Sequence, residues 1–264
     1  MPGEANLDDL FSVKGKTALV TGGSGGIGFM IASGLVKAGA SVTIAARNQD
    51  KLDDAAARLS EYGDCVGVQA DVGSPEGVDA LAGALNEHLD RLDILVNNAG
   101  ATWGKPLEKF PDDAWGALNA INVQGPFMLI QRLLPLLQAA ADRDAPASVI
   151  NIGSIYGFQT DVLTAYSYAA TKAAIHHLSR VLARDLTPRK IHVNAIAPGL
   201  FPSNMTQFML ENEAVMEQVV SHIPAGRPGA PDDVAGMVIF LASRAGAYVA
   251  GAVIPLDGGA LIAH

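Results

Sequence analysis

The sequence predicts an α/β protein: one domain built on a doubly wound parallel sheet with helices on both faces. Three observations predict it. Short apolar runs alternate with helical patterns, the composition is 49% hydrophobic but only 6% aromatic, and glycine occurs 28 times. Small residues favour close packing of helices on a sheet over an aromatic-rich β-sandwich. Because 264 residues can enclose one large core, we expect a single domain over residues 1–264.

The predicted strands are continuous apolar runs, as expected where helices cover both faces of a parallel sheet. In chain order the predicted elements are strand Thr17–Thr21, helix Ile27–Ala38, strand Ser41–Ala45, helix Asp50–Glu61, strand Cys65–Ala70, helix Pro75–Leu89, strand Leu92–Asn97, helix Trp115–Ala140, strand Ser148–Gly153, helix Ala165–Leu186, strand Ile191–Ala197, helix Asp232–Ser243 and strand Ala252–Leu256. The pattern loosens at about residues 200–222, with a helical stretch to Val220, and we expect this insert to be a lid over the substrate.

Charge and composition exclude several kinds of partner. The net charge is −9 without any run of Lys or Arg, so we expect neither nucleic acid nor an anionic membrane to bind. The start of the chain is acidic and unlike a secretory signal, and the most apolar helical stretch, 127–141, is too short to span a bilayer. We therefore expect a cytoplasmic protein. Its lone cysteine, Cys65, reads as a small core residue in a buried strand, and no metal site is predicted.

A glycine-rich loop follows the first strand and opens the first helix. Glycines let the backbone turn tightly and approach a pyrophosphate, and the helix N-terminus offers unpaired N–H groups and a positive dipole end. This context is typical of a Rossmann-type dinucleotide site rather than of a flexible turn. The loop residues are Thr21, Gly22, Gly23, Ser24, Gly25, Gly26, Ile27 and Gly28.

The end of the second strand indicates which dinucleotide binds. An acidic residue there would bind the adenosine ribose of NAD(H), but this strand ends in Ala46, Arg47 and Asn48. No carboxylate repels a 2′-phosphate, and the Arg47 guanidinium can pair with one. The sequence thus favours NADP(H) over NAD(H), the alternative being that Arg47 is only a solvated loop residue.

Tyr168 and Lys172 are four residues apart and so lie on one face of the helix after the fifth strand. A neighbouring ammonium and an oxidised nicotinamide would both favour the phenolate form of Tyr168 and lower its pKa. Tyr168 can then protonate a carbonyl oxygen as hydride arrives, or deprotonate an alcohol in reverse. A second phenol, Tyr166, points off that helical face and reads as a pocket or packing residue.

In these motifs the chain resembles the short-chain dehydrogenase/reductase family over residues 13–261. The resemblance also rests on Asp71 and Val72, on Asn97, Asn98, Ala99 and Gly100 after the fourth strand, and on Asn122, Ser154, Pro198 and Gly199. It implies that Ser154 hydrogen-bonds the substrate oxygen, that Lys172 holds the nicotinamide ribose, and that Asn122 fixes a water in a proton relay to Lys172. Asp71 and Val72 would contact adenine, and Pro198 and Gly199 would lie beside the nicotinamide.

Two features depart from the family pattern near the site. The spacing from Ser154 to Tyr168 is one residue longer than is common, and Ser203 stands where a threonine often contacts the carboxamide. We expect neither to abolish activity. Phe201, with Ser203, is also expected at the cofactor.

Within the family the chain is most similar to 3-oxoacyl thioester reductases. We predict an NADPH-dependent reductase of a 3-oxoacyl thioester or similar hydrophobic ketone. The alternatives are an NAD(P)-dependent alcohol or sugar dehydrogenase acting oxidatively, and a cofactor-binding regulator without the chemistry. Aromatic and apolar side chains after strand ends and in the insert are candidate lining of the substrate slot, with plain packing as the alternative: Trp103, Tyr156, Phe158, Phe201 and Met205.

The helices over 115–140 and 165–186 carry more apolar residues than one buried stripe needs. The family implies a homotetramer through such helices, with a dimer as the alternative. His176 and His177 lie on the second of these helices, and we expect them at its surface or in an interface.

Overall fold

Seven strands and the helices between them were located in a computed structural model, which describes residues 6–142, 145–160, 164–203, 206 and 213–263. The strands are β1 Thr17–Thr21, β2 Ser41–Ala46, β3 Cys65–Gln69, β4 Ile94–Asn97, β5 Ala147–Ile152, β6 Ile191–Pro198 and β7 Val253–Leu256. The α-helices are α1 Leu7–Leu10, α2 Gly26–Lys37, α3 Gln49–Ser60, α4 Pro75–His88, α5 Asp113–Asn119, α6 Gly125–Arg132, α7 Leu134–Ala140, α8 Tyr166–Leu186, α10 Glu213–Ser221 and α11 Pro231–Ala242. Short 3-10 turns cover Leu107–Lys109, Ile155–Gly157, Thr187–Arg189, Arg244–Gly246 and Ala260–Ile262.

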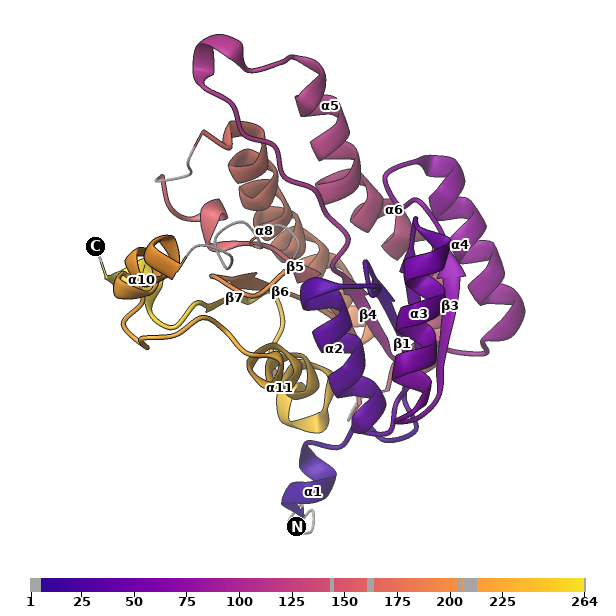
Figure 1. Cartoon of the computed structure of the whole chain (residues 1–264). Helices are drawn as coiled ribbons and strands as arrows, with labels where there is room; N and C mark the ends of the chain where they lie inside the picture. The colour runs from indigo at the N-terminus through magenta and orange to yellow at the C-terminus, as the bar shows by residue number, and fades with distance from the viewer. Residues whose placement is uncertain (1–5, 143–144, 161–163, 204–205, 207–212, 264) are drawn as a thin grey trace.

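All seven strands run parallel in the order β3-β2-β1-β4-β5-β6-β7, which confirms the predicted doubly wound sheet (Figure 1). The strand order reverses between β1 and β4. In such sheets, ligands bind outside the carboxyl ends of the strands at that reversal. The loops that leave β1, β4 and β5 therefore meet at one edge.

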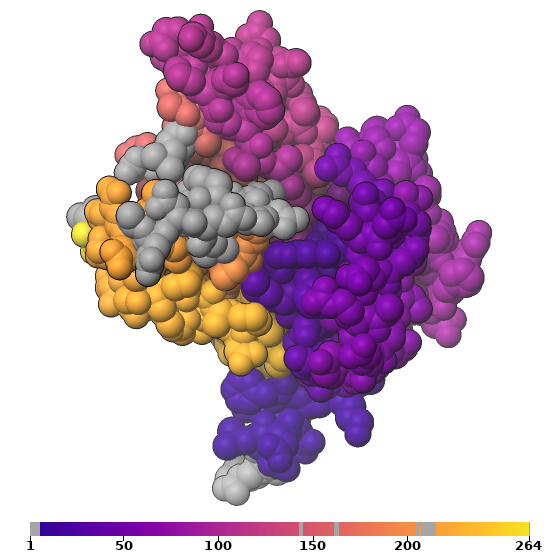
Figure 2. Space-filling model, in the orientation of Figure 1, coloured from indigo at the N-terminus to yellow at the C-terminus, as the bar shows by residue number. Residues whose placement is uncertain are grey.

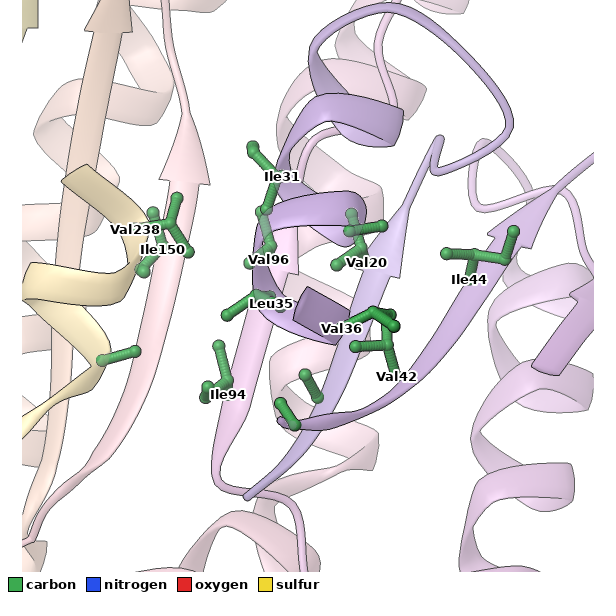
Figure 3. Close-up of a cluster of buried hydrophobic side chains, with 14 of the residues drawn as sticks. Val20, Ile31, Leu35, Val36, Val42, Ile44, Ile94, Val96, Ile150 and Val238 are labelled. Carbon is green, nitrogen blue, oxygen red and sulfur yellow. The ribbon is translucent and has the colours of Figure 1, made fainter. Parts of the chain in front are cut away.

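Two apolar layers hold the helices against the sheet. On one face α2, α3 and α11 cover the strands, and Figure 3 shows Ile31 and Leu35 of α2 over Val20 and Val96. On the other face α4, α6, α7 and α8 close a second cluster that includes Leu81, Leu129 and Val149 among its members. Both clusters are almost free of exposed surface, so the sheet edge that carries the loops rests on a rigid base.

The third predicted strand is not buried as a whole. Cys65 is buried, as expected, but Val66 is 54% exposed, and Cys65 is the one buried residue of the five in β3. β3 is an edge strand, since β2 is its only neighbour in the sheet. An apolar sequence run does not distinguish an edge strand from a central one, and this is why the prediction of a buried strand was wrong here.

The long helix predicted over 115–140 is interrupted twice. A π-turn over Ala120–Gln124 separates α5 from α6, and Leu133, with φ −93° and ψ 4°, separates α6 from α7. Pro135 lies in the first turn of α7, where its missing N–H and fixed φ favour a new helix start. The π-turn carries Asn122, and such turns are frequent at functional sites.

The segment after β4 stands away from the body of the molecule. Figure 2 shows α5 and the loop that precedes it, in magenta, projecting above the C-terminal segments in orange and yellow. Most of this loop, residues 102–109, is exposed. The insert at about 200–222 contains α10, but its role as a lid stays a prediction, and Met205 lies outside the described residues. Within the described ranges, no helix has both the length and the apolar character needed to cross a bilayer.

The glycine loop between β1 and α2 is fixed by its neighbour β4. Gly22 adopts φ +68°, which favours glycine, and the Asn98 side chain donates from Nδ2 to the carbonyl oxygens of Thr21 (2.9 Å) and Gly22 (3.3 Å). The Thr21 hydroxyl accepts the backbone N–H groups of Asn98 and Ala99, both at 3.0 Å. A Cβ atom at Gly28 would lie 2.3 Å from the Gly22 oxygen, so the first turn of α2 needs glycine there.

Two alanine substitutions in this loop should differ in their effect on stability. Gly28→Ala should lower the free energy of unfolding by about 2 kcal/mol, because the clash outweighs the helix propensity of about 1 kcal/mol that alanine gains. Gly25→Ala should change it by about 0.5 kcal/mol or less, since Gly25 is extended and a Cβ there meets open space. Denaturant unfolding without cofactor measures both, and equal changes would contradict this account of the loop.

Candidate active site

Tyr168 and Lys172 project from α8 toward the end of β5. The Tyr168 side chain makes a hydrogen bond with the Ser154 side chain, and Ser154 is the second residue after β5. Burial raises the pKa of Tyr168, while the bond to Ser154 acts in the opposite direction. This differs from the lowered pKa predicted from Lys172 and an oxidised nicotinamide: in the protein alone, desolvation of the phenolate dominates. A raised pKa keeps Tyr168 protonated, the form that a proton donor requires.

Lys172 is a buried cation with a backbone partner. Its Nζ donates to the Ile152 carbonyl oxygen at 2.8 Å and lies 5.5 Å from the centre of the Tyr168 ring. Burial lowers the pKa of Lys172 to about 8. The side chain is only 5% exposed, so its charge acts in a poorly solvated region beside the phenol.

Asn122 reaches the same region from the π-turn. Its Oδ1 accepts the Ala101 N–H, and its Nδ2 donates to the Ala101 carbonyl and to the Thr171 hydroxyl, all at 3.0 Å. A Cβ at Gly100 would lie 2.9 Å from Asn122 Oδ1 and 3.7 Å from Lys172 Nζ. Asn122 and Lys172 thus approach each other around Gly100, and the four predicted catalytic residues gather at one place.

Most of the predicted cofactor residues follow the carboxyl ends of β1 to β4. Gly25 is the N-cap of α2 and has no side chain that could cap the helix. The first backbone N–H groups of α2 therefore receive no side-chain hydrogen bond from the N-cap. The insert touches this loop, because a Cβ at Gly26 would meet Ser203 Cβ at 3.1 Å. Ser24 and Ile27 are partly buried, whereas Gly23 packs on Ile44, where a Cβ would clash.

Arg47 is exposed immediately after β2, and its carbonyl oxygen accepts the Gln69 side-chain amide at 3.0 Å. Asn48 caps α3 by accepting the Lys51 N–H at 2.9 Å. Hydrogen bonds thus hold the backbone at Arg47 and at Asn48, and the N-terminus of α3 follows directly. Such a position suits an anion.

Two further cofactor predictions concern the ends of β3 and β6. Asp71 is exposed and folds the next turn by accepting the Gly73 N–H at 3.0 Å, while Val72 is buried. Gly199 follows Pro198 at the end of β6 and lies against Asp257, which a Cβ at Gly199 would meet at 2.9 Å.

The predicted substrate residues differ in exposure. Trp103 is 44% exposed and Phe158 is 45% exposed, whereas the Tyr156 ring meets the Tyr168 ring edge to face at 6.1 Å. Phe201 is only 2% exposed and its ring fills the space beside Gly229. The Phe201 side chain is thus packed inside the protein, which was the alternative to a place in the substrate slot.

The sequence patterns did not predict the places of His176 and Thr171, whereas they did predict a packing role for Tyr166. The sequence predicts His176 at the helix surface or in an interface, but within the chain it is 3% exposed. Thr171 joins Asn122 to the Tyr168 carbonyl oxygen. His176 lies four residues after Lys172, and this spacing was the signal that it shares the buried face. Tyr166 packs edge to face on Phe110 with ring centres 5.5 Å apart, which matches its predicted packing role.

Comparisons with known proteins agree with this geometry. The family model described as enoyl-(acyl carrier protein) reductase matches residues 22–260. The rhamnolipids biosynthesis 3-oxoacyl-(acyl-carrier-protein) reductase of Pseudomonas aeruginosa is 51% identical over 94% of this chain and 97% of that protein. The solved P. aeruginosa RhlG/NADP active-site complex has a TM-score of 0.94 and 50% identity, covering 96% of this chain and 99% of the other.

A second kind of relative acts on a sugar acid. The 5-keto-D-gluconate 5-reductase of Escherichia coli is 34% identical over 97% of this chain and all of that protein. The fold, the motifs at the strand ends and these similarities lead to one assignment: the chain belongs to the short-chain dehydrogenase/reductase family of oxidoreductases.

Proposed function

We propose that the protein is an NADPH-dependent carbonyl reductase that converts a 3-oxoacyl thioester into the 3-hydroxyacyl thioester. The observation that carries the proposal is the Tyr168 hydroxyl, hydrogen-bonded to Ser154 beside the buried Lys172 ammonium. The 51% identical relative is named a 3-oxoacyl-(acyl-carrier-protein) reductase, and the RhlG neighbour is an NADP complex.

The residues at the strand ends fit a dinucleotide. Gly25 leaves open space over the α2 N-terminus, where a pyrophosphate would accept hydrogen bonds from backbone N–H groups. Arg47 would pair with the 2′-phosphate, Asp71 and Val72 would contact the adenine, and Lys172 would hold the nicotinamide ribose. When bound, NADPH supplies the hydride.

The side chains act on the substrate oxygen. As the carbonyl carbon receives hydride, the electron pair of the C=O π bond moves to oxygen, and Ser154 and Tyr168 stabilise the developing charge. Tyr168 then gives its proton to that oxygen, which completes the alcohol and leaves a phenolate. Asn122 would fix a water in a proton relay to Lys172, whose Nζ lies beside the Tyr168 ring.

The thioester is favoured over a sugar acid on two grounds. The thioester reductase is 51% identical to this chain and the keto-gluconate reductase 34%. Exposed apolar rings at Trp103 and Phe158 suit an acyl chain better than a polyol. A keto-sugar reductase, or an oxidative alcohol or sugar dehydrogenase, is the alternative; turnover of an acetoacetyl thioester against 5-keto-gluconate separates the two substrate classes.

Assembly and location stay predictions. Exposed apolar side chains lie on three helices, Trp115 on α5, Phe127 on α6 and Val181 on α8, each between 42% and 50% exposed. These side chains support a homotetramer through α5, α6 and α8, with a dimer as the alternative. A cytoplasmic location stays a prediction, and the net charge of −9 favours neither nucleic acid nor an anionic membrane as a partner.

Tyr168→Phe should lower kcat/KM for NADPH-dependent reduction of an acetoacetyl thioester by about 10²- to 10⁴-fold, because it removes the proton donor. NADPH oxidation followed at 340 nm measures it. Tyr166→Phe is the matched control, since its ring packs on Phe110 and should keep wild-type rates. A Tyr168→Phe variant with more than a tenth of wild-type activity would contradict the assignment.

Arg47→Ala should raise KM for NADPH by about 10- to 100-fold and leave KM for NADH nearly unchanged, because only NADPH carries the 2′-phosphate that a charge-assisted bond would hold. Arg58→Ala is the control, because Arg58 is an exposed arginine on α3, the helix that follows Arg47. Equal losses with both cofactors would show that Arg47 does not recognise the phosphate.

Lys172 should make stability depend on pH in a defined direction. Its pKa is about 8 in the folded protein and about 10.5 when unfolded, so between these values the unfolded state holds more protons. Wild-type stability relative to Lys172→Met should therefore rise from pH 8 to 10.5, by at most about 1.4 kcal/mol per pH unit. Denaturant unfolding without cofactor measures it, with exposed Lys105→Met as control; a pH-independent difference would contradict the burial argument.

A further inference from the structure

His176 is a buried imidazole that the proposed reaction does not use. It lies on α8 one turn after Lys172 and two turns after Tyr168, so all three side chains share one face of the helix. Its side chain is 3% exposed, far less than that of the neighbouring His177, which is exposed. A buried polar ring at this place calls for a partner, and that partner is the segment that carries Ser154.

The turn over residues 153–158 closes around the His176 ring. Nε2 faces the Ser154 backbone N–H at 3.4 Å, and the Phe158 ring covers the imidazole with centres 4.7 Å apart. A Cβ at Gly153 would lie 2.1 Å from Nε2, and one at Gly157 would lie 2.6 Å from Cε1. The turn therefore has glycine at both points where it passes the ring.

The same turn presents the proposed substrate oxygen ligand. Ser154 Oγ accepts the Tyr156 N–H at 3.2 Å and bonds to the Tyr168 side chain, while the Ser154 carbonyl accepts the Gly157 N–H at 3.0 Å. The His176 contact is made to the backbone of Ser154 itself. Movement of the imidazole would shift the Ser154 hydroxyl relative to Tyr168.

The ring is neutral at physiological pH. Burial, with the charges of Lys172 and Arg180, lowers the pKa of His176 to about 4. A neutral ring that accepts at Nε2 carries its proton on Nδ1, and Nδ1 has no hydrogen-bond partner among the described residues. An unpaired buried donor is costly, so a ring kept for packing alone is better replaced by an apolar side chain.

We propose that His176 is a positioning residue for the reductase reaction: by accepting the Ser154 N–H and filling the 153–158 turn, it sets the Ser154 hydroxyl beside Tyr168. This inference rests on the proposed function. His176 would then be the third functional side chain on α8, four residues after Lys172. It would act on the substrate only through Ser154.

Two substitutions of equal length separate acceptance from packing. In H176Q, Oε1 can accept the Ser154 N–H where Nε2 does, whereas H176M fills similar space without that acceptor. H177M, at the exposed neighbour, is the control. The readouts are kcat and KM with an acetoacetyl thioester, the NADPH dissociation constant from fluorescence, and the thermal midpoint.

We expect kcat of H176Q and H177M within about threefold of wild type and kcat of H176M lower by about tenfold or more, because small displacements of a positioned group are expensive in rate. The NADPH dissociation constant should stay within about twofold throughout. Rescue by glutamine together with a fall confined to kcat would not result from general destabilisation. A kcat for H176M within twofold of wild type, or equal losses in H176Q and H176M, would overturn the proposal.

Two further readouts keep the test decisive. If H176M does not fold, H176L also lacks the acceptor and takes its place, and the same loss of kcat is expected; unchanged kcat would overturn the proposal. Wild-type protein that binds NADPH but turns over no thioester would count against the proposed function. In that case crystal structures decide about His176: the 153–158 turn should keep its place in H176Q and shift in H176M.

Discussion

The structure depends on the polar contacts between one face of α8 and the end of β5. Tyr168 bonds to Ser154, Lys172 donates to the Ile152 carbonyl, and His176 faces the Ser154 N–H. Further along the helix, the Ser179 hydroxyl accepts the Asn151 side-chain amide at 2.8 Å. Buried polar groups must be paired, so these contacts allow one register of α8 on the sheet. The carbonyl-reducing geometry proposed above is a consequence of that register.

This arrangement holds a cation in a poorly solvated place, and no carboxylate among the described residues pairs with it. Burial alone accounts for the lowered pKa of Lys172, and the neutral state of His176 avoids a second buried cation four residues away. Holding these groups costs folding free energy. The apolar clusters on both faces of the sheet supply the compensation, and α8 itself contributes Leu182, Ala183 and Leu186 to the second of them. Site and core thus share one buried face of the same helix, the site toward its N-terminus and the core toward its C-terminus.

The sequence was sufficient for the fold and for gathering the site because both follow from periodicity. Predicted strand and helix bounds differ from the observed ones by one or two residues in most elements, and the reversal of strand order brings the loop motifs together. Predictions from periodicity failed at residues whose position depends on tertiary contacts with other elements. The edge position of Val66, the π-turn at Asn122 and the burial of Phe201 under Gly229 all depend on tertiary contacts that no local pattern contains.

His176 is an instructive failure, because the signal was present. Its spacing from Lys172 placed it on the buried face, but histidine as a residue type is intermediate between buried and exposed, so its identity did not decide the matter. What overrode that expectation lies in the turn it contacts: Gly153 and Gly157 leave room for a ring that no other residue pair there would admit. The position of the turn that carries Ser154 therefore depends in part on Gly153 and Gly157. In the exposed loop over residues 102–109, by contrast, packing imposes little on the sequence.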